Sequence, residues 1–187
     1  MFDGPKLLST AQERRETVLT SAIAVFAKTG FLGTPITAVA RHAGISSAYV
    51  FKLFPSKEGL FASALDRCFE IIVKAMTDGA EQSADQTPTG VLSALGLAYA
   101  ALIADRDLLT LQVHAQSAAS VPEIGASFRA GIEKVTTYVK ARSGAPDADV
   151  QRFMANGLLC ALITTLSLED DSATWAHILT AGFSHPR

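Results

Sequence analysis

Apolar residues recur every three or four positions along most of the chain, which is the spacing of one face of an α-helix. In the segment 121–142, for example, Ile124, Phe128 and Ile132 lie on one such stripe. Alternation with a period of two is never long enough to indicate a β-sheet. Helices are predicted at about 10–29, 34–43, 46–54, 56–79, 88–105, 107–119, 121–142, 147–168 and 171–183. The sequence therefore predicts an all-α protein.

Two short helices joined by a tight turn are predicted between residues 34 and 54. Thr34 can cap the first helix, and Pro35 suits its first position, where an N–H would be unpaired anyway. Gly44 offers the left-handed backbone that ends a helix, and Ser46 can cap the second helix. Such a pair can place its second helix in a DNA major groove. On spacing alone, an ordinary helical corner with a solvated polar face is an equally good interpretation.

The helix 147–168 differs from the others because apolar residues occupy its whole circumference. A helix of this kind must be covered on all sides. We expect a subunit interface here, shared with the last helix, and a central core helix is the alternative. The residues expected at the interface of a homodimer are Phe153, Gly157, Leu158, Ala161, Leu162, Trp175, Ile178 and Leu179.

Charge is unevenly distributed along the chain, although the net charge is only −2. Residues 1–60 hold seven Lys and Arg against four acids, whereas residues 61–187 hold nine against fourteen. A basic N-terminal third on an acidic body suits a protein that touches nucleic acid with one end. With 49% hydrophobic and 18% charged residues, disorder is not expected.

The sequence contains no pattern that indicates a membrane span, a metal site, a cofactor or an enzyme. The longest largely apolar run, 91–104, favours a buried helix over a membrane span. Cys68 and Cys160 lie in apolar helical patterns, as expected for core thiols in a reducing cytoplasm. The four histidines lack metal-ligand spacing, and no phosphate-binding loop or nucleophile motif is present. A soluble cytoplasmic protein without catalytic residues is therefore expected.

The run AGISSAYVFKLFPSKEGLF, preceded by AVFAKTGFLGT, resembles the N-terminal domain of TetR-family transcription regulators. The similarity extends roughly over residues 12–61, with Thr34, Ala43–Ser46 and Ser56–Leu60 in register. The resemblance implies a three-helix helix-turn-helix DNA-binding domain at residues 1–60. It further implies a helical ligand-binding and dimerisation domain at residues 61–187.

The same resemblance assigns roles within the DNA-binding domain. Thr34 and Lys57 occupy positions that hold DNA phosphates in the family. The remaining expected contacts lie on the second helix of the corner: Ser46, Ser47, Ala48, Tyr49 and Lys52. Phe51 departs from the family pattern, because a tyrosine hydroxyl usually contacts phosphate there. Tyr49 is a possible replacement, while structural bracing by both rings and simple solvation of both lysines are the alternatives.

The resemblance implies a ligand-responsive regulator, expected to be a repressor that binds a near-palindromic DNA operator as a homodimer and is released by a small molecule. A largely apolar effector is expected, although each candidate contact also fits a plain core position. The candidates are Phe69, Met76, Tyr99, Leu102, Gln112, His114 and Phe128. The alternative is a helical protein that binds small molecules without reading DNA. No membrane partner is expected.

Overall fold

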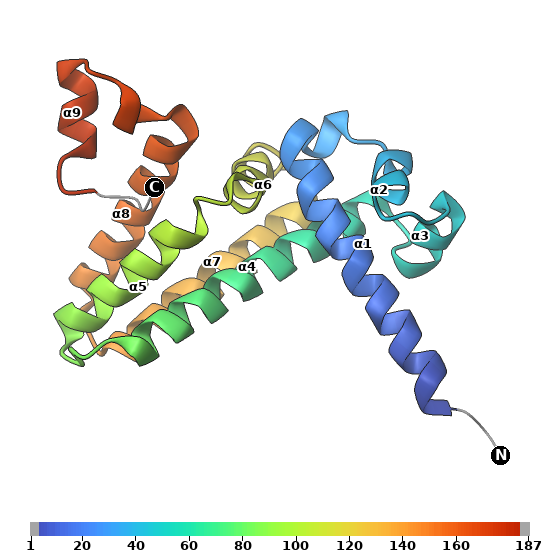
Figure 1. Cartoon of the computed structure of the whole chain (residues 1–187), viewed down its shortest axis with the longest axis horizontal. Helices are drawn as coiled ribbons and strands as arrows, with labels where there is room; N and C mark the ends of the chain where they lie inside the picture. Colours follow the sequence, from blue (N-terminus) through green and yellow to red (C-terminus); the bar gives the residue numbers. More distant parts are fainter. Residues whose placement is uncertain (1–3, 184–187) are drawn as a thin grey trace. The chain divides into compact units, whose positions relative to one another are not determined.

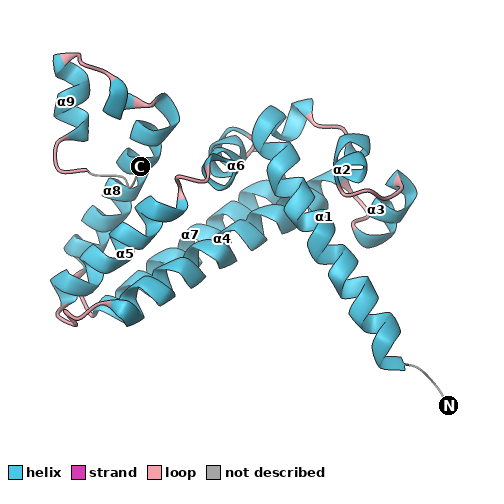
Figure 2. Cartoon of the chain, in the orientation of Figure 1, coloured by secondary structure: helices cyan, strands magenta, loops and turns pink. Residues whose placement is uncertain are grey.

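The computed structural model describes residues 4–183, with side chains from residue 11 onward. Within this range the backbone forms helices and loops and contains no strand (Figures 1 and 2). This confirms the predicted all-α fold. The helices are α1 (Gly4–Gly33), α2 (Ile36–His42), α3 (Ser47–Leu53), α4 (Lys57–Gln82), α5 (Pro88–Leu102), α6 (Arg106–Ser117), α7 (Pro122–Ser143), α8 (Asp147–Leu166), the 3-10 turn η1 (Leu168–Asp170) and α9 (Thr174–Thr180).

Several helix ends differ from those predicted. Helix α1 begins before residue 10 and extends past residue 29, but Gly30 inside it has φ 69° and ψ −179°, so two helical segments meet at a kink. Helix α8 ends at Leu166 because Ser167 adopts a left-handed conformation with φ 55°. Helix α9 is much shorter than the predicted 171–183. Periodicity alone does not locate these backbone departures.

The chain divides into two compact units. Unit 1 consists of residues Met1–Cys68 and Thr110–Arg129, and unit 2 of residues Phe69–Leu109 and Ala130–Arg187. Helices α4, α6 and α7 therefore each contribute residues to both units. The sequence did not indicate that residues 110–129 belong with the N-terminal helices. The predicted division at residue 60 is a functional one and stays a prediction.

Unit 1 is built on an aromatic core. Phe26 and Phe61 meet edge to face with their ring centroids 4.8 Å apart, and Phe31 meets Phe61 in the same way at 5.6 Å. Val18 and Ala22 precede Phe26 on α1 at the helical spacing of four residues and are completely buried. Edge-to-face rings gain electrostatic energy beyond their burial. This core fixes α1 and the start of α4 as the base on which α2 and α3 rest.

The helices of unit 2 are joined by close packing at a glycine and by side-chain hydrogen bonds. A Cβ atom added at Gly131 of α7 would lie 2.0 Å from the Phe69 ring of α4, so glycine is required there. The guanidinium of Arg142 donates to the Ala80 carbonyl at 3.1 Å and to Oε1 of Gln86 at 2.9 Å. These bonds tie the end of α4 and the following loop to α7.

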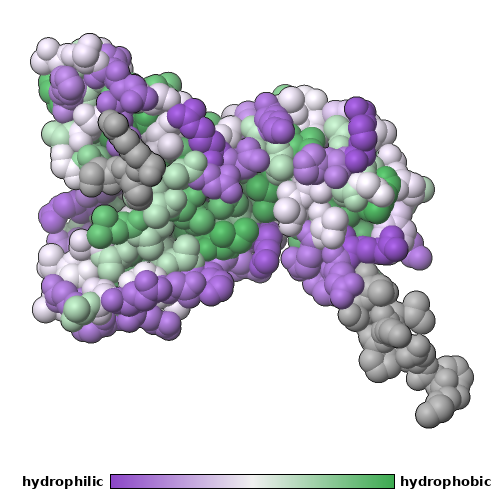
Figure 3. Space-filling model, viewed as in Figure 1, coloured by the Kyte–Doolittle hydropathy of each residue, from purple (hydrophilic) through white to green (hydrophobic). Residues whose placement is uncertain are grey.

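Apolar side chains remain on the surface of unit 2. Leu97 of α5 is 60% exposed, and apolar residues are visible in the region of α5 in the space-filling view (Figure 3). Within the described residues, no single helix is long and apolar enough to cross a membrane. Helices α5 and α6, bent at their break, pass that test only as a pair and only by length and composition.

Candidate nucleic-acid interface

The corner formed by α2 and α3 is held from inside by buried apolar side chains. Ile36, Val39 and Ala40 of α2 and Val50 of α3 are buried. Gly44 makes the turn with φ 67°, as expected for a helix-ending glycine. The Ser46 hydroxyl accepts a hydrogen bond from the backbone N–H of Tyr49 at 3.2 Å, which confirms the predicted cap of α3. The turn and cap thus set the direction of α3.

Thr34 does not have the role predicted from the sequence. Its side chain is completely buried, and its hydroxyl lies 2.7 Å from the Gly30 carbonyl and 2.5 Å from Oγ1 of Thr29. Pro35, not Thr34, is the N-cap residue of α2. The expectation that this hydroxyl contacts a phosphate is therefore corrected: it stabilises the passage from the kink of α1 into α2.

The outward face of α3 is small, aromatic and basic. Ala48 and Lys52 are exposed, and Phe51 is 47% exposed. Ser46 is also exposed, whereas Ser47 and Tyr49 are partly buried. The structure thus brings five of the predicted contact residues together on one helix and its cap, and adds Phe51 to them.

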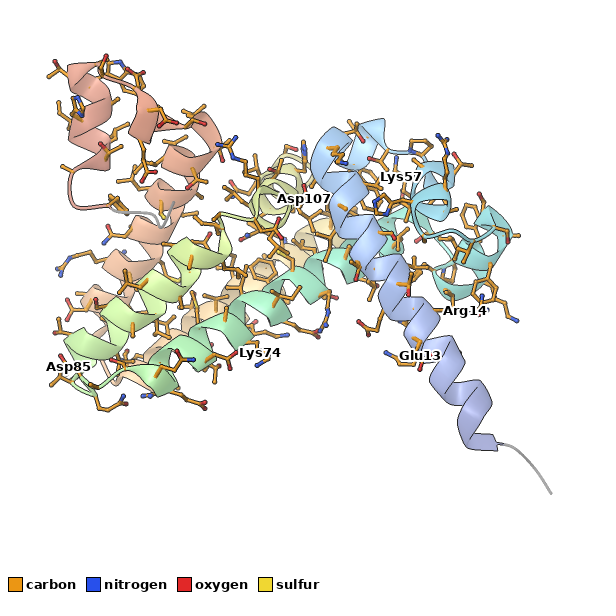
Figure 4. All side chains as sticks on the ribbon, in the orientation of Figure 1. Glu13, Arg14, Lys57, Lys74, Asp85 and Asp107 are labelled. Atoms are coloured by element: carbon orange, nitrogen blue, oxygen red, sulfur yellow. The ribbon has the colours of Figure 1, made fainter. Side chains whose placement is uncertain are left out.

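Three cations of unit 1 lie against aromatic rings, and they differ in how fully they are engaged. Arg15 donates to the Leu53 carbonyl at 2.9 Å and stacks 4.1 Å from the Phe54 ring centroid, so it fastens the end of α3 to α1. Lys57 donates to the Leu32 carbonyl at a longer 3.4 Å and stays partly exposed (Figure 4).

The third cation, Arg14, lies 5.5 Å from the Tyr49 ring centroid and is exposed (Figure 4). The bridge from α1 to the ring of Tyr49 orients that ring on α3. Arg14 and Lys57 therefore have cationic groups near the surface of the corner, whereas Arg15 is committed to holding it together. The predicted phosphate contact of Lys57 stays a prediction.

His114, predicted as a ligand anchor, lies in unit 1 against the kink of α1. Its Nε2 is 3.2 Å from the Ala27 carbonyl, and since a carbonyl only accepts, Nε2 carries the proton. A Cβ added at Gly30 would lie 2.9 Å from Nδ1 of the same ring. Gly30 is thus required both by its positive φ and by the imidazole. His114 connects α6 to α1, and nothing in the sequence pattern indicates this contact.

The seven predicted effector contacts divide between the two units. Gln112, His114 and Phe128 belong to unit 1, whereas the other four belong to unit 2. Phe69 and Met76 are buried, with Phe69 packed against the backbone of α7. Only Tyr99 lines a cavity of about 470 Å³ between α5 and α8. The predicted effector set stays a prediction, and apolar spacing alone does not separate core positions from cavity positions.

The predicted dimer residues divide between two sides of α8. Phe153 and Gly157 line the cavity beside α5, and Ala161 packs on the buried cluster around Cys160. These three are partly buried within the chain, and their place in a subunit interface stays a prediction. Five apolar residues are instead exposed, and we call them the α8/α9 stripe. They are Leu158 (60%), Leu162 (46%), Leu166 (56%), Trp175 (52%) and Ile178 (71%). Leu179 is partly buried, and Leu166 was not predicted.

Known proteins resemble this chain most clearly at the N-terminal corner. The family described as bacterial regulatory proteins, tetR family, matches residues 18–64. The HTH-type transcriptional repressor KstR of Mycolicibacterium smegmatis is 41% identical over 76 residues, which are 40% of this chain and 37% of KstR. The HTH-type transcriptional regulator YerO of Bacillus subtilis, described as uncharacterized, is 34% identical over 80 residues, 43% of this chain and 28% of YerO. The chain thus spans well under half the length of these curated relatives.

Solved structures match the fold over nearly the whole chain. FadR of Bacillus subtilis in complex with stearoyl-CoA gives a TM-score of 0.68 at 16% identity, covering 90% of this chain and 99% of FadR. A protein of Saccharomonospora viridis in complex with choline gives 0.67 at 17% identity, covering 91% and 93%. At such identities the likeness concerns the fold alone. Residues 18–64 are therefore similar to the tetR family of bacterial regulatory proteins, and the chain as a whole shares the fold of these solved structures.

Proposed function

We propose that the protein regulates transcription by binding double-stranded DNA through the outward face of α3. The observation that carries the proposal is the exposure of Ala48, Phe51 and Lys52 above a corner whose inner side chains are buried. A helix of this kind can enter a major groove, where lysine reaches phosphates or guanine edges and small or aromatic groups pack on thymine methyls. Ser46, Ser47, Tyr49 and Lys57 complete the proposed contact set.

The regulator acts, in this proposal, as a cytoplasmic homodimer on a near-palindromic operator, with its two α3 helices in successive major grooves about 34–36 Å apart. The exposed α8/α9 stripe supports a subunit interface, because large exposed apolar side chains gain free energy when a partner buries them. The name of KstR supports repression. The stearoyl-CoA and choline complexes of proteins with this fold support release by a small molecule.

Fluorescence anisotropy with a labelled duplex from the DNA flanking the protein's own gene tests the proposal. Affinity should fall steeply as salt rises, because cationic contacts with phosphate release counterions. Lys52→Ala should weaken binding about tenfold and, where Nζ meets a phosphate, reduce the log–log salt slope by about one. Lys134→Ala removes an exposed lysine from α7 in unit 2 and serves as the matched control, with no change expected.

Absence of salt-sensitive binding to any part of that DNA would contradict the proposal. It would favour the alternative of a helical protein that binds small molecules without reading DNA, which the missing hydroxyl at Phe51 also favours. Equal affinities of the Lys52→Ala variant and the parent at every salt concentration would remove Lys52 from the contact set.

A further inference from the structure

A cavity of about 470 Å³ lies between α5 and α8, within unit 2. Its size falls within the range typical of small-molecule sites. The C-terminal residues Gly182 and Phe183 also line it, and Phe183 packs on the buried cluster of Ala100, Ile103 and Cys160. Six of the seven effector contacts predicted from the sequence lie elsewhere, so this cavity needs its own explanation.

Two glycines keep the cavity open. Gly96 of α5 and Gly157 of α8 both line it, and a Cβ added at either would meet its nearest neighbour at 3.7 Å and 3.9 Å, which is ordinary contact. Glycine inside a helix costs about 0.5–1 kcal/mol relative to alanine. At Gly79 and Gly131 close packing explains the glycine, since an added Cβ would lie 2.6 Å and 2.0 Å from a neighbour. At Gly96 and Gly157 no neighbouring protein atom requires a glycine, and the space left by the missing side chains forms part of the cavity.

The cavity changes from polar to apolar along its length. Helices α5 and α8 run in the same direction beside it, since Gly96 lies opposite Phe153 and Tyr99 opposite Gly157. The residues near the two helix starts are mostly polar, with Leu92 and Phe153 as apolar exceptions, whereas those further along are largely apolar. The polar group is Thr89, Ser93, Asp149, Arg152 and Asn156, and the apolar group is Leu97, Tyr99, Ala100, Cys160 and Phe183.

The guanidinium of Arg152 offers several N–H donors at the polar end. Arg152 meets Asp149 through one N–H at 3.1 Å, and a guanidinium has five N–H groups in total. Asn156, Ser93 and Thr89 can each donate as well. The charges of Arg152 and Asp149 offset each other, and the guanidinium keeps N–H groups beyond the one that is bonded to Asp149. A head group that accepts several hydrogen bonds fits this end.

The apolar end stays uncharged at neutral pH. Burial, followed by the nearby Glu169 carboxylate, raises the pKa of the Cys160 thiol to about 11. The thiol is therefore protonated and behaves as a small apolar group. A hydrocarbon segment can lie against it and against the rings of Tyr99 and Phe183 without burying a charge.

From this gradient we infer that the cavity binds an elongated acidic amphiphile, with its carboxylate at Arg152 and Asn156 and its hydrocarbon segment between Gly96 and Gly157. The inference rests on the proposed function only in treating this ligand as the effector. Binding itself requires no DNA and no particular role in transcription.

Isothermal titration calorimetry with three probes of equal chain length tests the inference. Laurate, dodecanol and dodecylamine, each below its micelle-forming concentration, carry an acidic, a neutral and a basic head. Laurate should bind most tightly and dodecylamine least. Arg152→Gln should weaken laurate about tenfold, as expected for loss of a charge-assisted bond, and leave dodecanol unchanged. Lys134→Gln, which removes a positive charge from α7 outside the cavity, should change neither.

Filling the cavity supplies the second arm of the test. Gly157→Leu and Gly96→Leu each place an isobutyl group in it from opposite helices, and leucine is a better helix residue than glycine. Circular dichroism and DNA affinity without probe verify that each variant is folded. Both variants should lose laurate and dodecanol binding, and in the parent protein laurate should lower operator affinity.

The possible outcomes separate the site from its role. Laurate binding that both cavity-filling variants abolish supports the inference, whatever happens to DNA. No binding of laurate, binding that survives both variants, or tighter binding of dodecylamine overturns it. If laurate binds as expected but the protein never binds DNA, the proposed function fails and the amphiphile site remains.

Discussion

The two units of this protein differ in how far their side chains are engaged within the unit. In unit 1 the groups that could bind a partner are largely engaged within the unit, as the hydroxyl of Thr34, the guanidinium of Arg15 and the imidazole of His114 show. The outward face of α3 is left free. In unit 2 the α8/α9 stripe is exposed and a cavity stays open. Unit 1 thus uses its polar groups to hold one surface in place, whereas unit 2 leaves apolar surface exposed and a cavity open.

The glycines illustrate the same difference. Gly30 in unit 1 is required twice, by its φ of 69° and by the imidazole of His114. Gly96 and Gly157 in unit 2 are required by nothing in the protein and leave space. A glycine on a helix can therefore mark either the tightest contact or an unfilled one, and only the surrounding atoms distinguish the two cases.

Alanine substitutions at Gly30 and Gly96 test this difference between the units, and the larger loss of stability is expected at Gly30 in unit 1. Gly30→Ala should lower the free energy of unfolding by about 2–4 kcal/mol, since a left-handed alanine is strained and its Cβ displaces His114. Gly96→Ala should change it by less than about 1 kcal/mol, in the stabilising direction. Urea denaturation followed by circular dichroism measures both. Equal losses at the two positions would show that unit 2 is as tightly packed as unit 1.

A charge on the α8/α9 stripe should break the proposed dimer without unfolding the subunit. Leu158→Glu should weaken association by about 2–3 kcal/mol, because a carboxylate would be buried opposite apolar groups. Sedimentation velocity across a concentration series measures the change. Leu32→Glu places the same charge on an 89% exposed leucine of unit 1 and should leave association intact. A parent protein that is monomeric at every concentration would remove the interface from the proposal.

Local signals explain which parts of this molecule could be predicted. The helices, the turn at Gly44 and the cap at Ser46 depend on residues within a few positions of one another, and the structure contains all of them. The contact between His114 and Ala27 joins residues 87 positions apart. No spacing rule contains such information, so His114 was assigned to a ligand instead of to the kink of α1.

The two sides of α8 show a second limit. Because apolar residues surround this helix, its periodicity cannot tell which side faces α5 and which faces outward. Contact with Tyr99 and Ala100 places Gly157 and Cys160 inside, which leaves Leu158 and Leu162 outside. The predicted interface on α8 therefore included three residues from the side that faces α5 or the buried cluster, and the interface itself stays a prediction.

A double-mutant cycle should sharpen the account of unit 1. His114→Ala alone should destabilise the protein by about 1 kcal/mol, through loss of packing and of one hydrogen bond. When the two substitutions are combined, loss of the imidazole should remove the steric part of the Gly30→Ala penalty and leave the backbone strain at residue 30. The double variant should thus be more stable than the sum of the singles predicts, by about 1 kcal/mol in urea denaturation. Strict additivity would mean that the imidazole does not press on residue 30.

The smallest effect is expected at the free surface itself. Phe51→Tyr adds a hydroxyl to an exposed ring on α3, at the position where the resemblance to TetR-family regulators implies a tyrosine that contacts phosphate. DNA affinity should rise about three- to tenfold, as one added hydrogen bond allows, while stability and the salt slope stay constant because no cation is added. Tyr49→Phe is the converse variant: a loss of affinity there would show that Tyr49 already supplies the hydroxyl, and the gain from Phe51→Tyr should then be small. If neither variant alters the anisotropy titration, both rings brace the corner, and DNA recognition by α3 depends on Lys52 and its small neighbours alone.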